Sequence, residues 1–375
     1  MKRNIVVSII AIVISIMLSA YMYWNVADNK EKVNYSADMT LKEVSMNNEI
    51  KVNELLHILS HKNRNVWSLP LNVPIKILGM NNEDVQLALE HIKQENRPIK
   101  SAVKYVLWSI WFSIIIIFVL TRKKIKKTRI IILLSAVIIF GVILGAVPNP
   151  MESTVKYFKM LNNMGGNPKE LTAAVILFSL FSLLGNKIMC SWGCHLGALQ
   201  ESIFNLPVFK NKYKVQLPFS ISLSVRILLF AVFIFLLFGF GAGITSGSKY
   251  FVIYHHLNYF KMFEPNELAV FALYSLPVFI LCSLFVYRPF CQLVCPFGLY
   301  AWCLENVAIN KIQIIRDKCI QCQLCVKICP TEAMKAIYQN KRKYLLPDCW
   351  SCGRCVEVCP EDAIVYGSNK ELIKQ

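Results

Sequence analysis

The chain has 375 residues, of which 55% are hydrophobic and only 17% are charged, so it is too apolar for an ordinary soluble protein. None of its fourteen cysteines lies before Met189, which excludes disulfide links within the first half of the chain. A formal net charge of +18 suggests either nucleic acid binding or a membrane topology. The position of the basic residues along the chain decides between these two classes.

The chain begins with Lys2-Arg3 and an apolar run over residues 5–24. About 20 apolar residues are needed to cross a bilayer, so residues 1–24 predict a signal-anchor transmembrane helix. A cleaved signal peptide is the alternative, although the small-residue cleavage candidates near Ala20 and Ala27 are weak.

Residues 25–101 are polar and predict a small, mainly helical extracytoplasmic domain. Thr40 is typical of the residue that caps a helix, and Val85 to Ile92 form a second amphipathic run. The segment carries no basic stripe. We therefore interpret it as a structural or docking module and not as a DNA reader.

Five more apolar segments follow, at residues 102–120, 130–147, 171–184, 221–243 and 268–287. With the first helix they predict six transmembrane helices. If Met1 is cytoplasmic, the cytoplasmic segments hold 25 basic and nine acidic residues, whereas the rest of the chain holds 16 and 14. The positive-inside rule therefore accounts for the excess charge, which removes the motive for nucleic acid binding. It predicts a multi-pass protein of the cytoplasmic (inner) membrane with both termini in the cytoplasm.

Two related cysteine motifs end the fourth and sixth predicted helices. They are Cys190-Ser-Trp-Gly-Cys194-His195-Leu-Gly197 and Cys291-Gln-Leu-Val-Cys295-Pro296-Phe-Gly298. Their separation of 101 residues suggests a parallel repeat, which would bring the four cysteines together at the inner face. Three interpretations remain open: ligands of an additional redox centre such as an iron-sulfur cluster, redox-active thiols, or small packing residues.

Other polar residues in the apolar half have plainer explanations. His255-His256 could serve a quinone or a haem, but an interfacial aromatic belt explains the surrounding tyrosines and phenylalanines more simply. Arg226 can extend to the inner membrane surface, or it can hold an acidic cofactor or lipid. Cys282 and Cys303 match no ligand spacing, so we expect both to be structural.

The last part of the chain contains two copies of one cysteine pattern. They are Cys319, Cys322, Cys325 and Cys329-Pro330, then Cys349, Cys352, Cys355 and Cys359-Pro360. The spacing C-x2-C-x2-C lets one loop present three thiolates to an iron-sulfur cube, while the fourth, before proline, serves the other cluster. Disulfides or zinc sites are the alternatives, and the doubled spacing leaves little room for either.

This pattern resembles that of bacterial two-cluster ferredoxins over about residues 311–366. The resemblance implies an α+β domain with two 4Fe-4S clusters in the cytoplasm, where reducing conditions keep thiolates available. The first cluster would be held by Cys319, Cys322, Cys325 and Cys359. The second would be held by Cys349, Cys352, Cys355 and Cys329.

Paired C-x3-C motifs ahead of such a domain resemble the membrane ferredoxins NapH and NosR over about residues 130–366. NapH is linked to periplasmic nitrate reductase and NosR to nitrous oxide reduction. His195 replaces the proline of the first motif, and the extracytoplasmic segment lacks the covalent-flavin threonine motif of NosR. The resemblance therefore implies a class of protein and not a particular pathway.

Together these features predict an α-helical membrane protein with a C-terminal two-cluster ferredoxin-like domain. Its parts would be residues 1–24, 25–101, a five-helix core over 102–303 and the cytoplasmic domain over 304–375. The predicted function is electron transfer between a cytoplasmic carrier and quinone or an extracytoplasmic redox protein, as part of an oxidoreductase system with no substrate site of its own. The alternative is a factor that senses redox state or matures a partner metalloenzyme.

Overall fold

The protein is analysed as a computed structural model. The structure describes residues 35–36, 38–48, 55–56, 59, 70, 72–78, 81–95, 98–121, 126–162, 168–207, 213–239, 252–264, 268–340 and 346–367. The predicted signal anchor over residues 5–24 lies outside these ranges, so its prediction stands as it was made.

Two helices with a small core of their own lie near the N-terminus. Helix α2 (Leu41–Asn47) is capped by Thr40, whose hydroxyl accepts a hydrogen bond from the Glu43 amide at 3.1 Å. The Glu43 carboxylate accepts one from the Thr40 amide at 2.9 Å, which completes a capping box. Helix α4 (Asn82–Glu95) presents Val85 and Leu89 to the same small core. Both predicted helices are confirmed.

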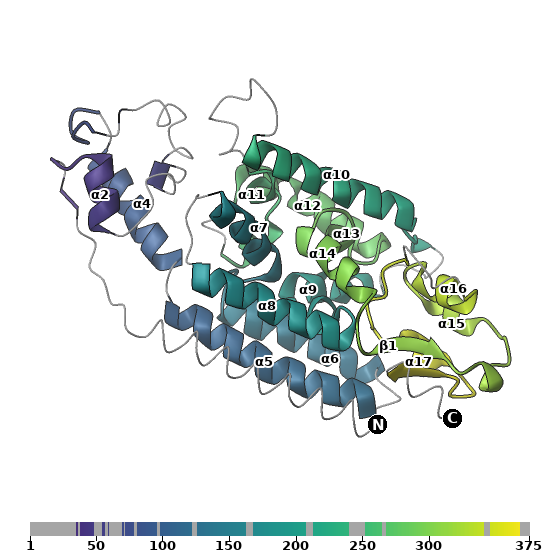
Figure 1. The fold of residues 1–375 in the computed structure, drawn as a ribbon. Coiled ribbons are helices and arrows are strands. Elements are labelled where there is room, and N and C mark those ends of the chain that lie inside the picture. The colour runs from purple at the N-terminus through teal and green to yellow at the C-terminus, as the bar shows by residue number, and fades with distance from the viewer. Residues whose placement is uncertain are drawn as a thin grey trace.

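The helices between α4 and the C-terminal unit form one large core, with α2 and α4 at one end of it and the C-terminal unit at the other (Figure 1). All five apolar segments predicted within it are helical. They are α5 (Pro98–Thr121), α6 (Lys126–Val137) with its π-helical continuation Ile138–Ile143, α8 (Pro168–Gly185), α10 (Phe219–Phe238) and α12 (Val270–Phe285).

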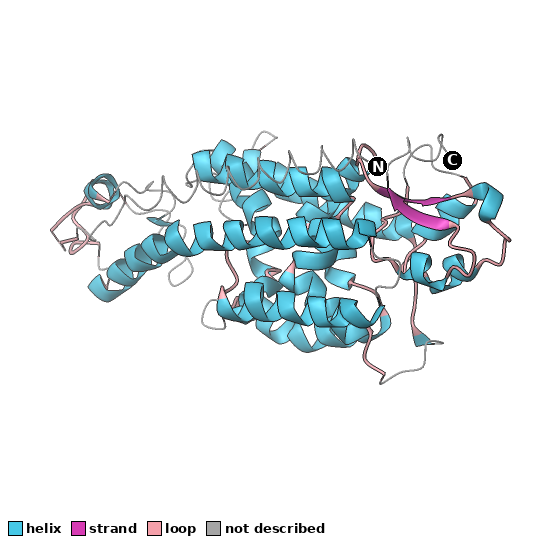
Figure 2. Ribbon diagram, turned by 90° about the horizontal axis from the view of Figure 1, so that it is seen from below, coloured by secondary structure: helices cyan, strands magenta, loops and turns pink. Residues whose placement is uncertain are grey.

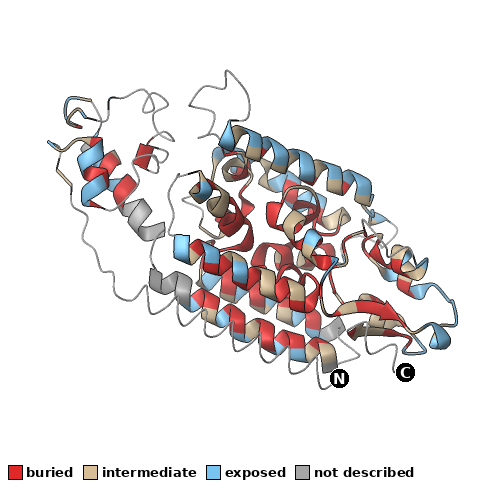
Figure 3. Ribbon diagram, in the orientation of Figure 1, coloured by how far each residue is buried: buried red, intermediate tan, exposed pale blue. Residues whose placement is uncertain are grey.

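By length and composition, three described helices can cross a membrane: Val103–Leu120 within α5, then α8 and α10. The apolar helices Thr128–Ile143 and Val270–Phe285 are shorter. Large apolar side chains on the outer faces of α10 and α12 are exposed, including Leu228 at 63% and Tyr274 at 80% (Figure 3). Exposed apolar faces of this extent are typical of a surface that contacts lipid or another protein.

Several shorter helices pack inside the core, and the apolar runs did not predict them as separate elements. They are α7 (Pro150–Leu161), α9 (His195–Phe204), α11 (Ile253–His256), the 3-10 turn Tyr259–Phe263, α13 (Pro289–Leu293) and α14 (Pro296–Glu305). Helices α9 and α14 each begin directly after the second cysteine of a C-x3-C motif, so they help to position the cysteines of these motifs.

The C-terminal unit packs against one end of the core (Figures 1 and 2). Its two strands, β1 (Lys311–Ile314) and β2 (Ile364–Gly367), pair antiparallel with Lys311 opposite Gly367. The connecting chain forms a 3-10 turn (Arg316–Lys318), α15 (Leu324–Ile328), α16 (Ala333–Tyr338) and α17 (Arg354–Val358). A small core under the sheet contains Ile312, Met334 and Ile364.

Candidate iron-sulfur and core cysteine sites

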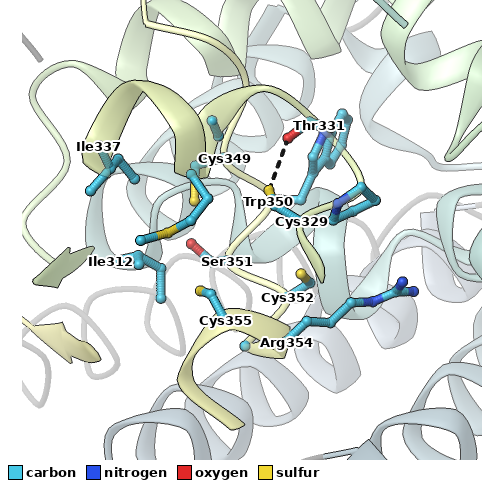
Figure 4. A pocket seen from close by; sticks show the side chains of 14 residues that line it. Ile312, Cys329, Thr331, Ile337, Cys349, Trp350, Ser351, Cys352, Arg354 and Cys355 are labelled. Atoms are coloured by element: carbon cyan, nitrogen blue, oxygen red, sulfur yellow. Dashed lines mark hydrogen bonds between the residues drawn. The ribbon is translucent and has the colours of Figure 1, made fainter. Parts of the chain in front are cut away.

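Four cysteines of the C-terminal unit line one cavity with an empty volume of about 370 Å³ (Figure 4). They are Cys329, Cys349, Cys352 and Cys355, and we call them the second cradle. In Figure 4 the labelled sulfur atoms point toward the same space, with Ile312 and Ile337 closing one side. Three of the cysteines come from one loop, and Cys329 comes from the other repeat.

The other four cysteines of the doubled pattern line a second cavity of about 350 Å³. They are Cys319, Cys322, Cys325 and Cys359, which we call the first cradle. The backbone amide of Ala363 donates a hydrogen bond to the Cys359 sulfur at 3.3 Å. The structure thus groups the eight cysteines in the two sets that the ferredoxin resemblance implies.

The two loops owe their shared shape to backbone conformation. Gln321 and Gln323 have φ of +59° and +58°, and Ser351 and Gly353, at the same two positions of the other loop, have φ of +46° and +78°. Left-handed residues on either side of the middle cysteine curl the loop, so that three thiols face one cavity. Most residue types adopt this conformation at a cost, which is typical of a functional loop.

The donor set of each cradle fits a 4Fe-4S cluster. Four thiols line each cavity, and thiolates are the usual ligands of such clusters. Among the described residues, no three His, Cys, Asp or Glu side chains lie close enough to hold a single metal ion.

The two cradles differ in their surroundings. Beside the first cradle Ile320 is 60% exposed and Cys322 is exposed as well. In the second cradle Trp350 and Ser351 are each only 2% exposed, because this loop faces the helical core. The loop of the first cradle is thus more exposed to solvent than the loop of the second cradle.

A buried ionic contact fixes the second cradle to the core. Asp348, directly before Cys349, pairs with Lys187 and with the Arg226 guanidinium, whose Nη2 lies 2.6 Å from Oδ2. The Cys349 amide donates to the Glu305 carboxylate at 3.1 Å. Arg226 is therefore buried against the C-terminal unit, and the expectation that it extends to the membrane surface is wrong.

Hydrogen bonds between neutral groups extend this contact. The Asn186 side chain donates to the Cys349 carbonyl at 3.1 Å, and the Ser351 hydroxyl donates to the Asn186 carbonyl at 2.8 Å. The indole N–H of Trp192 donates to the Ser351 carbonyl at 3.1 Å. The loop of the second cradle thus contacts the same segment that carries the first C-x3-C motif.

The cysteines of the two C-x3-C motifs are all buried in the core. We call Cys190, Cys194, Cys291 and Cys295 the core cysteine set. Burial, followed by the charge of the neighbouring Cys291, raises the pKa of Cys194 to about 12. Burial, followed by the charges of the three other thiols, also raises the pKa of Cys295 well above its ordinary value. The four thiols therefore form one electrostatically coupled group, and a metal centre there would have to displace their protons.

The core cysteine set lies well inside the helical core. The carbonyl of Gly193, the residue before Cys194, accepts a hydrogen bond at 3.2 Å from the indole of Trp108 on α5. Trp108 precedes the last residue of α5, Thr121, by 13 residues, which is about 20 Å of helix. The first motif therefore packs against α5 well before that helix ends, while the predicted position of the four cysteines at the inner face stays a prediction.

The two motifs share a local design. Lys187 and Arg288, each three residues before the first cysteine, have φ of +63° and +49°. At Gly197 a Cβ would lie 3.0 Å from the Cys190 carbonyl oxygen, and at Gly298 one would lie 2.7 Å from that of Cys291. Each glycine lets its helix pass directly over the first cysteine of its own motif.

A second buried carboxylate joins the two motifs. Glu201 on α9 accepts hydrogen bonds from Arg129 at 2.7 Å and from Arg288 at 2.6 Å. Arg288 also donates to the carbonyls of Cys190 and Ser191. Glu201 is thus paired with two cations, Arg129 and Arg288, from different parts of the chain. Asp348 is paired in the same way with Lys187 and Arg226.

The segment with His255-His256 does not form a simple interfacial belt. Tyr254 and Phe260 are buried, and the Phe260 ring centroid lies 5.0 Å from that of His195. The segment therefore folds back onto the core beside Cys194, and both histidines are half-buried. Cys282 and Cys303 are exposed and join none of the three cysteine groups.

Sequence reasoning missed the acids and the tryptophan that connect the parts. The sequence showed three of these residues only as acidic residues: Asp348, Glu201 and Glu305. It showed Trp192 only as one residue within the first C-x3-C motif. A usable signal existed, because an acid directly before a ligand cysteine or within an apolar helix is costly unless it is paired. Sequence alone does not show which cation is the partner.

The comparisons agree with the geometry of the two cradles. Residues 312–366 match the family model of a 4Fe-4S dicluster domain. The C-terminal unit is thus similar to dicluster domains, and we refer to it below as the dicluster domain. A further match is with "Putative electron transport protein YccM" from Escherichia coli (strain K12), 27% identical over 173 residues. The match covers 44% of this chain and 48% of that protein, so the chain spans about half the length of this relative. No solved structure matches.

Proposed function

We propose that this chain is a membrane electron-transfer protein of the NapH and NosR type. The dicluster domain and the similarity to a protein named for electron transport support iron-sulfur electron transport in general. In this proposal the first cradle and the second cradle each hold a 4Fe-4S cluster, and the core cysteine set holds or forms a third redox centre. Electrons pass between a cytoplasmic carrier and quinone or an extracytoplasmic redox protein.

One observation carries the proposal: the second cradle is docked on the segment that holds two of the core cysteines. Lys187 and Trp192 both lie in the stretch around Cys190 and Cys194, and they bind Asp348 and Ser351 of the cradle loop. This contact holds the ferredoxin-like domain beside the core cysteines, as electron transfer into the core would require. Its buried ion pairs favour a fixed path into the core.

The residues of this chain have separable roles in such a path. The exposed first cradle can meet a soluble carrier, because Cys322 and Ile320 are open to solvent. Asp348, Arg226 and Lys187 hold the second cradle in place, while Glu201 holds the two motifs together. When bound, the clusters supply one-electron chemistry, and burial and hydrogen bonds to the sulfur atoms set their potentials. A core centre well inside the helical core would shorten the distance that electrons must cross, since a hydrocarbon layer is about 30 Å thick.

The test replaces Cys194 and Cys295 together by serine in protein purified without oxygen. Wild-type protein should contain about eight iron atoms in the C-terminal domain, plus those of the core centre. The double variant should keep both ferredoxin-type signals in paramagnetic resonance spectra, yet its clusters should no longer be reoxidised by quinone in membranes.

Replacing the exposed Cys303 by serine is the matched control, and it should change neither property. Reoxidation of the double variant at the wild-type rate would reduce the core cysteines to packing residues. Stoichiometric zinc without charge-transfer absorption would contradict the clusters themselves. Loss of maturation of a partner enzyme, with electron flow intact, would favour the alternative role in assembly or regulation.

A further inference from the structure

The second cradle and the core cysteine set lie on two sides of one short piece of chain, the π-helical turn Met189–Gly193. Trp192 stands in this turn, two residues from Cys190 and two from Cys194. We propose that Trp192 is the bridge through which electrons pass between the second cradle and the core cysteine set. This inference rests on the proposed function.

The contacts of Trp192 reach both sites. Its indole N–H donates to the Ser351 carbonyl at 3.1 Å, and Ser351 lines the second cradle between Cys349 and Cys352. On its other side the tryptophan is joined to the core cysteines by its own backbone. Electron tunnelling weakens steeply with each gap through space, so a path of covalent bonds with one hydrogen bond couples two centres better than packed contacts do.

Trp192 is also held firmly. The side chain is fully buried, and the Arg129 guanidinium lies 4.0 Å from the centre of its ring. Its carbonyl accepts a hydrogen bond from the Trp111 indole at 3.0 Å. Because the Arg129 cation lies over the ring and the Trp192 carbonyl is hydrogen-bonded, the ring is held in one position. The distance between the two sites therefore stays constant.

Other contacts across this boundary reach the core cysteines less directly. The ion pair of Lys187 with Asp348 ends at a flexible side chain, and Asn186 lies four residues before Cys190. Trp302 donates to the Leu346 carbonyl at 2.7 Å, yet its own segment follows the motif by seven residues. The contact of Trp192 differs from these. Its aromatic ring donates a hydrogen bond to a residue of the second cradle, and a core cysteine lies two residues away on each side of it.

The step is a simple exchange. If each site holds an iron-sulfur centre, one electron would leave the cluster in the second cradle, which is thereby oxidised, and would arrive at the centre held by the core cysteine set, which is thereby reduced. No bond forms or breaks, and no proton moves. Trp192 itself is neither oxidised nor reduced, because its role is to improve the coupling between the two sites.

The experiment compares full-length wild-type protein with W192L, W192F and the control W302L. Iron content and cluster potentials are measured first. Electrons are then injected rapidly by a photoreductant, and their arrival at the core centre is followed by freeze-quench paramagnetic resonance. We expect W192L to slow this step about tenfold or more, and W192F to slow it less because the ring remains. Potentials and iron content should stay at wild-type values, and W302L should transfer at the wild-type rate.

Three results would overturn the inference. A W192L variant with all centres present and the wild-type transfer rate would show that electrons take another path. Equal slowing in W302L would assign the effect to general loosening of the boundary. A wild-type protein with no electron acceptor in the core would remove the proposed core centre, and the role of Trp192 with it, so this failure is recognised before any variant is compared.

Discussion

At the scale of single residues, the buried carboxylate of Asp348 decides how the C-terminal unit is attached. Burial by itself would raise the pKa of Asp348, but Lys187 and Arg226 outweigh burial and lower it. Its carboxylate therefore stays ionised at neutral pH. Because the folded pKa is the lower one, this stabilisation is complete above the ordinary value of about 4 and is lost only as the pH falls through the lowered pKa.

We expect D348N to weaken the attachment of the dicluster domain severely. The substitution leaves the buried Arg226 without its anion and Lys187 with only its longer ion pair to Glu305 at 3.6 Å, and breaking such a buried pair costs about 3–5 kcal/mol. Limited proteolysis should then release the dicluster domain, and the second cradle should lose its cluster more readily than the first.

The control is D317N, because Asp317 lies on the exposed 3-10 turn of the same domain. It should behave as the wild type in both measurements. A D348N protein that resists proteolysis as the wild type does would show that the remaining hydrogen bonds suffice to hold the domain.

At the scale of elements, helices α9 and α14 position the core cysteines. Each begins directly after the second cysteine of its motif, so Cys194 and Cys295 are the N-cap residues of the two helices. Backbone amides at a helix N-terminus favour negative charge, which suits a thiolate. The close approach at Gly197 and Gly298 then sets the distance between each helix and the first cysteine of its motif.

We expect G298A to disturb the core centre and spare both cradles. A Cβ at this position would lie 2.7 Å from the Cys291 carbonyl oxygen, so the backbone of the motif must move. Overpacking of this kind costs about 1–3 kcal/mol. The measurement is iron content together with paramagnetic resonance, which should show loss of the core signal and retention of the other two.

A suitable comparison is G239N at the end of α10. Gly239 also has a positive φ, of +64°, but no atom lies within 4 Å of a Cβ built there, and asparagine tolerates this conformation. This variant should keep all signals. A core signal of full intensity in G298A would mean that the motif adapts without moving its cysteines.

At the scale of the whole molecule, the order of parts fits a path across a membrane. The small N-terminal module lies at one end of the helical core and the dicluster domain at the other (Figure 1). Between them α10 and α12 expose large apolar side chains, and the basic residues gather on the segments that we assign to the cytoplasm. We interpret the two ends as opposite sides of the membrane.

Reporter fusions test this arrangement directly. We expect a fusion at Lys51 to report an extracytoplasmic position, and fusions at Lys126 and Gln375 to report the cytoplasm. An external C-terminus would contradict the whole account, because it would place the cysteines of both cradles in an oxidising compartment.

The sequence by itself determined the local chemistry of this protein. Repeated spacing of Cys319 to Cys359 predicted two four-cysteine groups, and apolar runs predicted the helices, because both signals depend only on neighbouring residues. Tertiary structure alone decided how deeply the C-x3-C motifs are buried and what they contact, since packing between distant segments leaves no periodic signal. It also decided which cations meet Asp348 and Glu201, and that Trp192 reaches Ser351, because those partners are 72 to 161 residues apart and only the packing of the helices brings them together.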